Sequence, residues 1–368
     1  MTAVHKIRMP KATAIKGRGA ASQVVGRYEK TISEGEDDGW GSLYARGETD
    51  PAAAPATEVA EERARTIISR NQSPDVGFSQ SVNPYRGCEH GCVYCFARPS
   101  HAYLDLSPGL DFETRLSAKT NAAERLRAEL AKPGHVPHPI ALGINTDGWQ
   151  PIERDYRISR ECLEVLLEAR HPLSIVTKAS LISRDIDLLA ALAEQRLVHV
   201  SISVTTLDNR LSAKLEPRAA APHTRLRNLS LLREAGVPAG VLVAPIIPMI
   251  TDREIEHILE AVHDAGALDA GYVLLRLPHE LKDIWREWLE LHYPERAAHV
   301  MSLIRQMRGG KEYDSAYGTR MRGEGPFAQL IAQRFRKAHA RLGFAGMPRL
   351  DTTRFMPPRR PTPQGELF

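Results

Sequence analysis

Cys88-Glu89-His90-Gly91-Cys92-Val93-Tyr94-Cys95 is the most informative stretch of this 368-residue chain, because it holds three of the four cysteines. The spacing is C-x3-C-x2-C, with an aromatic residue directly before the third cysteine. Three thiolates on one short loop can bind three irons of a cubane [4Fe–4S] cluster and leave the fourth iron without a protein ligand. An iron with an open position can bind a small molecule, so the stretch predicts a catalytic cluster on Cys88, Cys92 and Cys95.

Two other uses of these cysteines fit the spacing less well. A structural zinc site takes four ligands, usually from two separated pairs, and this chain has no second pair because Cys162 stands alone. His90 as a fourth ligand would be cramped between Cys88 and Cys92. A disulfide framework is not expected in a chain of this length with one cysteine left over.

The motif C-x3-C-x-aromatic-C resembles the signature of the radical S-adenosylmethionine (SAM) enzymes. The wider segment, residues 83–99, resembles one branch that is similar to spore photoproduct lyase and is often labelled DNA repair photolyase. This resemblance extends over roughly residues 65–345. It implies that SAM chelates the open iron and is reductively cleaved there, with the electron coming from an electron-donor protein. The resulting 5′-deoxyadenosyl radical then abstracts hydrogen from a substrate.

Composition agrees with a soluble enzyme. Hydrophobic residues make up 42% of the chain and charged residues 26%, which is ordinary for a globular protein. No apolar run is long enough to span a membrane, and the N-terminus has no apolar core of a secretory signal. Free cysteines and an oxygen-sensitive cluster both favour the reducing cytoplasm. The net charge of +4 says little about nucleic acid.

An α/β fold follows from apolar runs that alternate with helical patterns. Strands are expected at residues 78–82, 140–145, 173–177, 197–204, 240–247 and 272–277, and helices at 160–170, 184–195, 225–235 and 253–265. Ser159 is expected to cap the first of these helices. Such alternation predicts parallel strands with right-handed crossovers. Six units make a partial (β/α)6 barrel, which is also what the resemblance implies.

Four regions are expected along the chain. Residues 1–64 are rich in Gly, Ala and charged residues and predict a flexible segment. The partial barrel would occupy residues 65–280, a basic helical extension residues 281–345, and an extended Pro- and Arg-rich tail residues 346–368.

Candidate SAM-binding residues lie where strands should end, because function gathers at the C-terminal ends of parallel strands. Asp147 or Glu153 follows the second strand, where this sequence departs from the Gly-Gly-Glu that binds the SAM amino group in most radical SAM enzymes. Lys178 ends the third strand, and the resemblance implies that it contacts SAM. A polar turn and a surface lysine are the respective alternatives. Ser203 on the fourth strand is a candidate for the ribose, or for a layer of the barrel core.

Three further residues complete the candidate site. Tyr94 is expected, by resemblance, to offer backbone contacts to the adenine, although it could also simply shield the cluster. Glu216 and Arg218 follow the fourth strand and are candidates for binding a carboxylate, or for pairing with neighbours. No catalytic side chain is identified. Spore photoproduct lyase uses a cysteine thiol as a hydrogen donor, and the only spare cysteine, Cys162, falls in a helical pattern typical of a buried structural residue.

Nucleic acid is a candidate partner because residues 296–341 contain ten Lys or Arg against three Asp or Glu. A stripe this basic can follow a phosphate backbone, and a solvated helical face can produce the same count. The chain ends in Gln364-Gly365-Glu366-Leu367-Phe368. Gln364, Leu367 and Phe368 resemble the peptide by which bacterial repair proteins dock to the sliding clamp, although Gly365 departs from the commoner form.

The sequence therefore predicts a radical SAM enzyme, lyase-like or transferase-like, that acts on nucleic acid in a DNA repair-like reaction. Radical modification of a protein or a small metabolite is an alternative. A noncatalytic metal-binding protein that holds nucleic acid is a further one, which iron and sulfide content would distinguish. The motifs do not identify the substrate.

Overall fold

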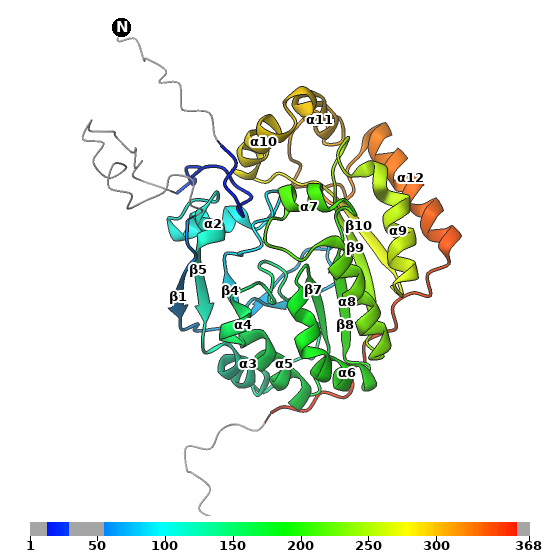
Figure 1. Ribbon diagram of the computed structural model, residues 1–368. Helices are drawn as coiled ribbons and strands as arrows, with labels where there is room; N and C mark the ends of the chain where they lie inside the picture. The colour runs from blue at the N-terminus through cyan, green and yellow to red at the C-terminus, as the bar shows by residue number, and fades with distance from the viewer. Residues whose placement is uncertain (1–12, 29–54, 359–368) are drawn as a thin grey trace, which may run out of the picture.

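A partial barrel forms the centre of the computed structural model, which describes residues 13–28 and 55–358. Seven strands form one sheet in the order β10-β9-β8-β7-β6-β3-β2, and the two outermost strands do not pair with each other. Strands β3 and β6 to β10 run parallel, whereas β2 is antiparallel to β3. Helices cover the outside of the sheet (Figure 1). The predicted α/β partial barrel of six parallel strands is confirmed.

The parallel strands lie close to their expected positions, because each is an apolar run of strand length. The strand side chains form much of the hydrophobic core, and fully buried examples are Ile140, Leu142, Ile175 and Val200. The strands of this sheet are β2 (Ile68–Arg70), β3 (Gln80–Val82), β6 (Ile140–Leu142), β7 (Leu173–Thr177), β8 (Val198–Ser203), β9 (Ala239–Ile246) and β10 (Ala270–Leu274).

The longer outer helices each bury apolar side chains in the core that contains the sheet, as their spacing predicts. The expected cap at Ser159 is wrong. The helix already begins at Ile158, after Arg157 with φ 55°, and the buried Ser159 hydroxyl donates to the carbonyl oxygen of Gly148 at 2.5 Å. The longer outer helices are α3 (Ala122–Leu130), α5 (Ile158–Glu168), α6 (Ile186–Glu194), α8 (Pro222–Glu234) and α9 (Ile255–Asp264), and the shorter ones are α4 (Glu153–Tyr156) and α7 (Asn209–Leu215).

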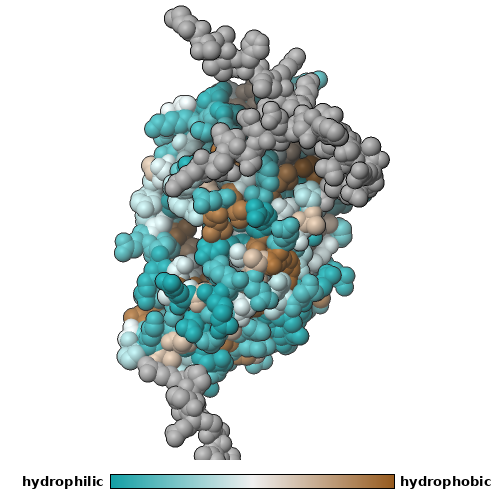
Figure 2. All heavy atoms as spheres, turned by 90° about the vertical axis from the view of Figure 1, so that its left-hand side faces the viewer, coloured by the Kyte–Doolittle hydropathy of each residue, from teal (hydrophilic) through white to brown (hydrophobic). Residues whose placement is uncertain are grey.

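A second, small sheet was not expected from the sequence. It has the order β1-β5-β4 and consists of β1 (Glu58–Glu62), β5 (Arg115–Lys119) and β4 (Tyr85–Arg86). The short helix α2 (Asp111–Thr114) leads into β5. The face of the molecule on this side is mostly hydrophilic, with separate apolar areas (Figure 2). The sheet is hard to predict because its strands come from three distant parts of the sequence.

The prediction of a flexible segment over residues 1–64 is wrong for residues 13–28 and for β1. Arg18 and Ala20 are 7% and 2% exposed. The carboxylate of Glu113 accepts hydrogen bonds from the backbone N–H groups of Gly19 at 2.9 Å and Ala20 at 2.8 Å. Residues 13–28 therefore pack against the body of the molecule next to the cysteine loop.

The helical extension shares its core with the cysteine loop. Helices α10 (Leu281–His292) and α11 (Pro294–Gln306) lie over the end of the barrel (Figure 1). The rings of Trp285 and Trp288 stack with centroids 4.9 Å apart and belong to the same hydrophobic cluster as Val93 and Tyr94. Helix α12 (Gly325–Leu342) instead packs along α9. Burial of the loop side chains therefore depends on the extension.

The described part of the C-terminal tail, residues 346–358, forms no helix or strand and is attached to the barrel. The backbone N–H groups of Gly346, Asp351 and Met356 donate to carbonyl oxygens in the barrel at 2.8–2.9 Å. Phe355 contacts the rings of His135 and His171. Gln364, Leu367 and Phe368 lie outside the described residues. Across residues 13–28 and 55–358, no helix has both the length and the hydropathy needed to cross a membrane.

Candidate functional site

One cavity of about 490 Å³ occupies the C-terminal ends of the parallel strands. Its walls come from the cysteine loop and from the C-terminal parts of β6, β7, β8, β9 and β10 with the residues that follow them. Two further loops complete the wall: residues 71–78, between β2 and β3, and the segment between α11 and α12 that contains Arg320 and Met321. The volume is typical of a site for a small molecule or cofactor. The cavity therefore lies where the fold class predicts function.

The three cysteines of the motif line this cavity together. Cys88 and Cys92 are buried and Cys95 is partly exposed, and no disulfide joins them. Burial raises the pKa of the Cys88 and Cys92 thiols, so in the absence of a metal both are neutral. Within the described ranges, no three His, Cys, Asp or Glu side chains are grouped so as to hold one metal ion. A cubane cluster instead needs one thiolate for each of three irons, and a loop with three thiols on one cavity fits that demand.

A buried ion pair shapes the cysteine loop. Arg98 donates to the carbonyl oxygens of Cys92 at 2.9 Å and Gly91 at 3.1 Å, and it pairs with Glu113. Both side chains of the pair are fully buried. Gly91 has φ 65°, and an added β-carbon there would lie 2.6 Å from the Glu113 carboxylate, so glycine is required. Charge-assisted bonds to loop carbonyls thus fix the backbone that bears the thiols.

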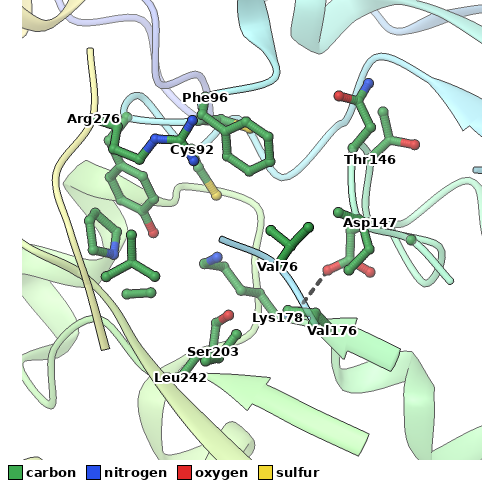
Figure 3. A pocket seen from close by; sticks show the side chains of 18 of the residues that line it. Val76, Cys92, Phe96, Thr146, Asp147, Val176, Lys178, Ser203, Leu242 and Arg276 are labelled. Carbon is green, nitrogen blue, oxygen red and sulfur yellow. Dashed lines mark hydrogen bonds between the residues drawn. The ribbon is translucent and has the colours of Figure 1, made fainter. Parts of the chain in front are cut away.

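Asp147 and Lys178 face the cysteines from the ends of β6 and β7 (Figure 3). The Asp147 carboxylate accepts from the Thr177 hydroxyl at 2.8 Å and from the backbone N–H of Lys178 at 2.8 Å. It lies 3.4 Å from Nδ1 of His90, whose pKa burial lowers to about 4. Asp147 therefore ties the two strand ends and the cysteine loop together. Glu153, its alternative in the sequence, is fully buried outside the cavity and accepts from the backbone of Ser159 at 3.0 Å.

Lys178 is the cation nearest the middle of the site (Figure 3). Its ammonium nitrogen lies 5.8 Å from the centroid of the Tyr94 ring, and no carboxylate in the described part of the chain pairs with it. Tyr94 and Ser203 line the same cavity, and Ser203 is 2% exposed. The structure thus brings Tyr94, Asp147, Lys178 and Ser203 together around the three thiols.

Glu216 and Arg218 are not among the residues that line the cavity. Glu216 is buried behind Tyr94 and accepts from its hydroxyl and, at 2.7 Å, from that of Thr205. Burial raises the pKa of Glu216, and an ion pair with buried Arg225 opposes that shift. Arg218 pairs with Glu89 at 3.0 Å. Both residues therefore form the neighbour pairs that the sequence left open, and Glu216 also holds the Tyr94 ring in position.

Several residues of the site have no motif in the sequence. Phe96 and Arg276 line the cavity near Cys92 and Cys95 (Figure 3). Asp75 and Arg320 join the two loops between the outer strands through an ion pair of 2.5 Å. These residues come from loops that are adjacent only in the folded chain, so spacing alone could not identify them. Among them, only Phe96 could have been suspected from the sequence, because it directly follows the third cysteine of the motif.

Cys162 lies away from the cavity. It is fully buried in α5, and burial raises the pKa of its thiol. It is not among the cavity-lining residues. The sequence prediction of a structural cysteine agrees with this environment.

Five of the ten basic residues of 296–341 are paired with a carboxylate or bonded to backbone carbonyl oxygens. Arg334 pairs with Glu256 on α9 at 2.6 Å, and Arg341 pairs with Glu260 at 2.5 Å. Arg305 and Arg320 are also in ion pairs, and Arg308 is buried against three carbonyl oxygens. Half of the positive charge counted in the sequence thus stabilises the fold. The other basic side chains of the stripe are Arg296, Lys311, Arg322, Arg336 and Lys337.

Comparisons with known proteins agree with this geometry. The family described as the Radical SAM superfamily matches residues 82–262. An uncharacterized protein of Mycobacterium tuberculosis is 38% identical over 231 residues, which cover 62% of this chain and 68% of that protein. A protein of a Pseudomonas phage named Radical SAM Nalpha-GlyT isomerase is 25% identical over 206 residues, covering 53% of this chain and 41% of that protein.

Solved structures of spore photoproduct lyase share the fold. The enzyme complexed with dinucleoside spore photoproduct aligns with a TM-score of 0.57 at 15% identity, over 78% of this chain and 80% of that chain. At this identity the likeness concerns the fold alone.

Proposed function

Because this chain belongs to the radical SAM superfamily, we propose that it holds a [4Fe–4S] cluster on Cys88, Cys92 and Cys95 with SAM beside it. The main support for this proposal is that the three thiols and Lys178 line one cavity at the strand ends. When bound, these cofactors supply reductive cleavage of SAM and hydrogen abstraction from a substrate. The protein orients the cluster and SAM relative to each other and encloses them in a partly closed cavity.

Lys178 is proposed to bind the carboxylate of SAM. A lysine with no carboxylate partner, at the wall of a cavity, is a point charge that suits an anionic group. The Tyr94 ring, 5.8 Å from the ammonium, supports the cation on its other side. Ser203 offers a hydroxyl for the ribose, and Asp147 positions Lys178 through its backbone N–H. Glu216 acts through Tyr94 and does not itself contact SAM.

The substrate is proposed to be nucleic acid, in a repair-like reaction. Spore photoproduct lyase, which shares the fold, was solved with a dinucleoside spore photoproduct. The cavity of this chain has an exposed aromatic ring and cations at its wall, which is the chemistry that binds nucleotides. The reaction is proposed to differ from one with a thiol hydrogen donor, because Cys162 is buried in α5 outside the cavity.

Anaerobic reconstitution with iron, sulfide, SAM and dithionite tests this proposal. Each of the three variants Cys88→Ala, Cys92→Ala and Cys95→Ala should lose the visible cluster absorbance and the production of 5′-deoxyadenosine, and the matched variant Cys162→Ala should keep both. Stoichiometric zinc in anaerobically purified protein would refute the cluster. DNA or RNA should increase 5′-deoxyadenosine production and yield altered nucleotides. If neither nucleic acid has an effect, the substrate is a protein or a small metabolite.

A further inference from the structure

The guanidinium of Arg276 lies over the ring of Phe96 in the cavity wall, beside the cysteines. Phe96 directly follows Cys95, and Arg276 lies just beyond the end of β10. The guanidinium carbon of Arg276 is 5.3 Å from the centroid of the Phe96 ring. The ring is 44% exposed although it lines the cavity. Figure 3 shows both side chains next to Cys92. A planar aromatic face with a cation beside it is therefore open to a ligand at this place.

Among residues 13–28 and 55–358, the guanidinium of Arg276 has no strong hydrogen-bond acceptor. Its Nη1 lies 3.3 Å from the sulfur of Met321, which is a weak acceptor. Its Nε is buried and has no hydrogen-bond partner. No carboxylate among the described residues forms an ion pair with it, whereas Arg320 on the same wall pairs with Asp75. The terminal guanidinium nitrogens of this cavity-lining residue can instead donate charge-assisted bonds to an anionic ligand.

Arg276 and Lys178 are two separate anion sites. They follow β10 and β7, and strands β8 and β9 lie between these in the sheet. SAM has a single carboxylate, and Lys178 already provides a point charge for it. If Lys178 binds the SAM carboxylate as proposed, the second cation is available to the substrate, which has to bind in the same cavity.

We propose that Arg276 and Phe96 form the subsite for one nucleotide of the substrate, in which Arg276 binds a backbone phosphate and Phe96 stacks on a base. This rests on the proposed function and names the residues that recognise its substrate. Arginine presents a planar fork of donors that matches phosphate oxygens. Stacking on an aromatic ring binds any base, so the subsite selects for a nucleotide rather than for a sequence. It holds that nucleotide beside Cys92 and Cys95.

The test is equilibrium binding of a fluorescent eight-residue single-stranded oligothymidylate to the reconstituted protein with SAM, read by anisotropy. The second probe is the same oligomer with an uncharged methylphosphonate backbone. The wild-type protein should bind the phosphodiester at least tenfold more tightly. Arg276→Gln should weaken phosphodiester binding about tenfold and leave methylphosphonate binding unchanged. Phe96→Ala should weaken both probes, and Phe96→Tyr should restore them. Arg233→Gln is the matched control, because exposed Arg233 lies on α8, outside both the cavity lining and the basic stripe.

Two results would overturn the subsite and they can be told apart from failure of the function. If the wild-type protein binds both probes equally, or if Arg276→Gln binds the phosphodiester like wild type, the subsite is refuted while nucleic acid stays the substrate. If the wild-type protein binds neither probe, the nucleic-acid substrate is refuted, and the subsite with it. The wild-type comparison needs no variant, so misfolding of Arg276→Gln cannot leave the question open. Cluster absorbance and SAM affinity of each variant monitor its folding.

Discussion

Gly19 lies directly against the carbonyl oxygen of Gly91, in the middle of the cysteine loop. A β-carbon built on Gly19 would be 1.8 Å from that oxygen and 3.2 Å from the backbone nitrogen of Val93. The two glycines are held there by Glu113, which accepts from the Gly19 N–H and pairs with Arg98. An N-terminal segment thus forms the outer support of the loop that bears the thiols.

Gly19→Ala should therefore impair cluster binding. The contact is with backbone, so the cysteine loop or residues 13–28 must shift, and overpacking of this kind costs about 1–3 kcal/mol. We expect a several-fold lower iron and sulfide content after reconstitution. The control is Gly77→Ala, because an added β-carbon there meets nothing within 4 Å. Equal iron content in the two variants would show that the segment does not support the loop.

Lys178→Ala should weaken SAM binding by roughly tenfold, the effect of losing one charge-assisted contact of about 1.4 kcal/mol. The thiols are untouched, so the cluster should still assemble. Isothermal titration of SAM under anaerobic conditions measures the effect. Lys311→Ala removes the same charge at an exposed position and should leave the affinity unchanged. A wild-type affinity in Lys178→Ala would remove this residue from the SAM site.

The ion pair between Asp75 and Arg320 should keep the side of the barrel closed. Asp75 accepts from Arg320 at 2.5 Å and from the backbone N–H of Gly318 at 2.7 Å, and its side chain is 8% exposed. Hydrogen bonds to a charged group contribute about 1.5–3 kcal/mol each. Asp75→Asn should therefore raise hydrogen exchange in residues 71–79 and 311–323 by about tenfold or more.

The control for this loop pair is the exposed ion pair between Arg86 and Glu62 at 2.6 Å. Glu62→Gln should leave exchange in residues 71–79 and 311–323 as it is in the wild type. Unchanged exchange in Asp75→Asn would mean that other contacts hold the two loops together.

Nucleic-acid binding by the basic stripe, if present, should depend on the exposed residues Arg336 and Lys337 rather than on Arg334. Arg334 donates twice to Glu256 and joins α12 to α9. Charge reversal at Arg336 and Lys337 should reduce the slope of log affinity against log salt by about 0.7 for each lost phosphate contact with a single strand. Arg334→Gln should instead lower the stability by up to about 1 kcal/mol and keep the slope. The reverse pattern would contradict this division.

Stability should fall in acid through His171. The pKa of His171 is lowered from 6.5 to about 4, mainly because the ring is buried and also because His135 lies beside it. The unfolded chain takes up this proton below about pH 6.5 and the folded chain only near pH 4, so stability present above pH 6.5 is lost between these values. At about 1.4 kcal/mol for each pKa unit, the loss reaches at most about 3 kcal/mol.

His171→Gln should flatten the pH dependence of the melting temperature between pH 7 and pH 5. The ring of His171 lies 3.0 Å from His135 and contacts Phe355, so acid should also loosen the tail at Phe355. Exposed His223→Gln is the control for a histidine replaced elsewhere. An acid response in His171→Gln as steep as in the wild type would refute the assignment.

Local chemistry made much of this protein predictable from its sequence. Three cysteines within eight residues predict a cluster loop whatever surrounds them, because the proposed ligand set is contiguous. The strands were predictable because a buried parallel strand is a short apolar run, and β7 has its expected bounds, Leu173–Thr177. Placing Asp147, Lys178 and Ser203 at strand ends followed from the rule that such ends share one side of a barrel.

Only the tertiary structure decided which charges are free and which support the fold. Glu216 and Arg334 look like binding residues in the sequence, but Glu216 is paired with Arg225 and Arg334 with Glu256, which is far away along the chain. Arg276 has no motif, and it becomes a candidate because folding places it beside Phe96 with no carboxylate partner in the part of the chain that the structure describes. Residues 13–28 lack apolar periodicity, yet Glu113 and Gly91 hold them in place. The physical reason is that pairing and burial depend on distances across the folded chain, whereas motif and periodicity report only neighbours along it.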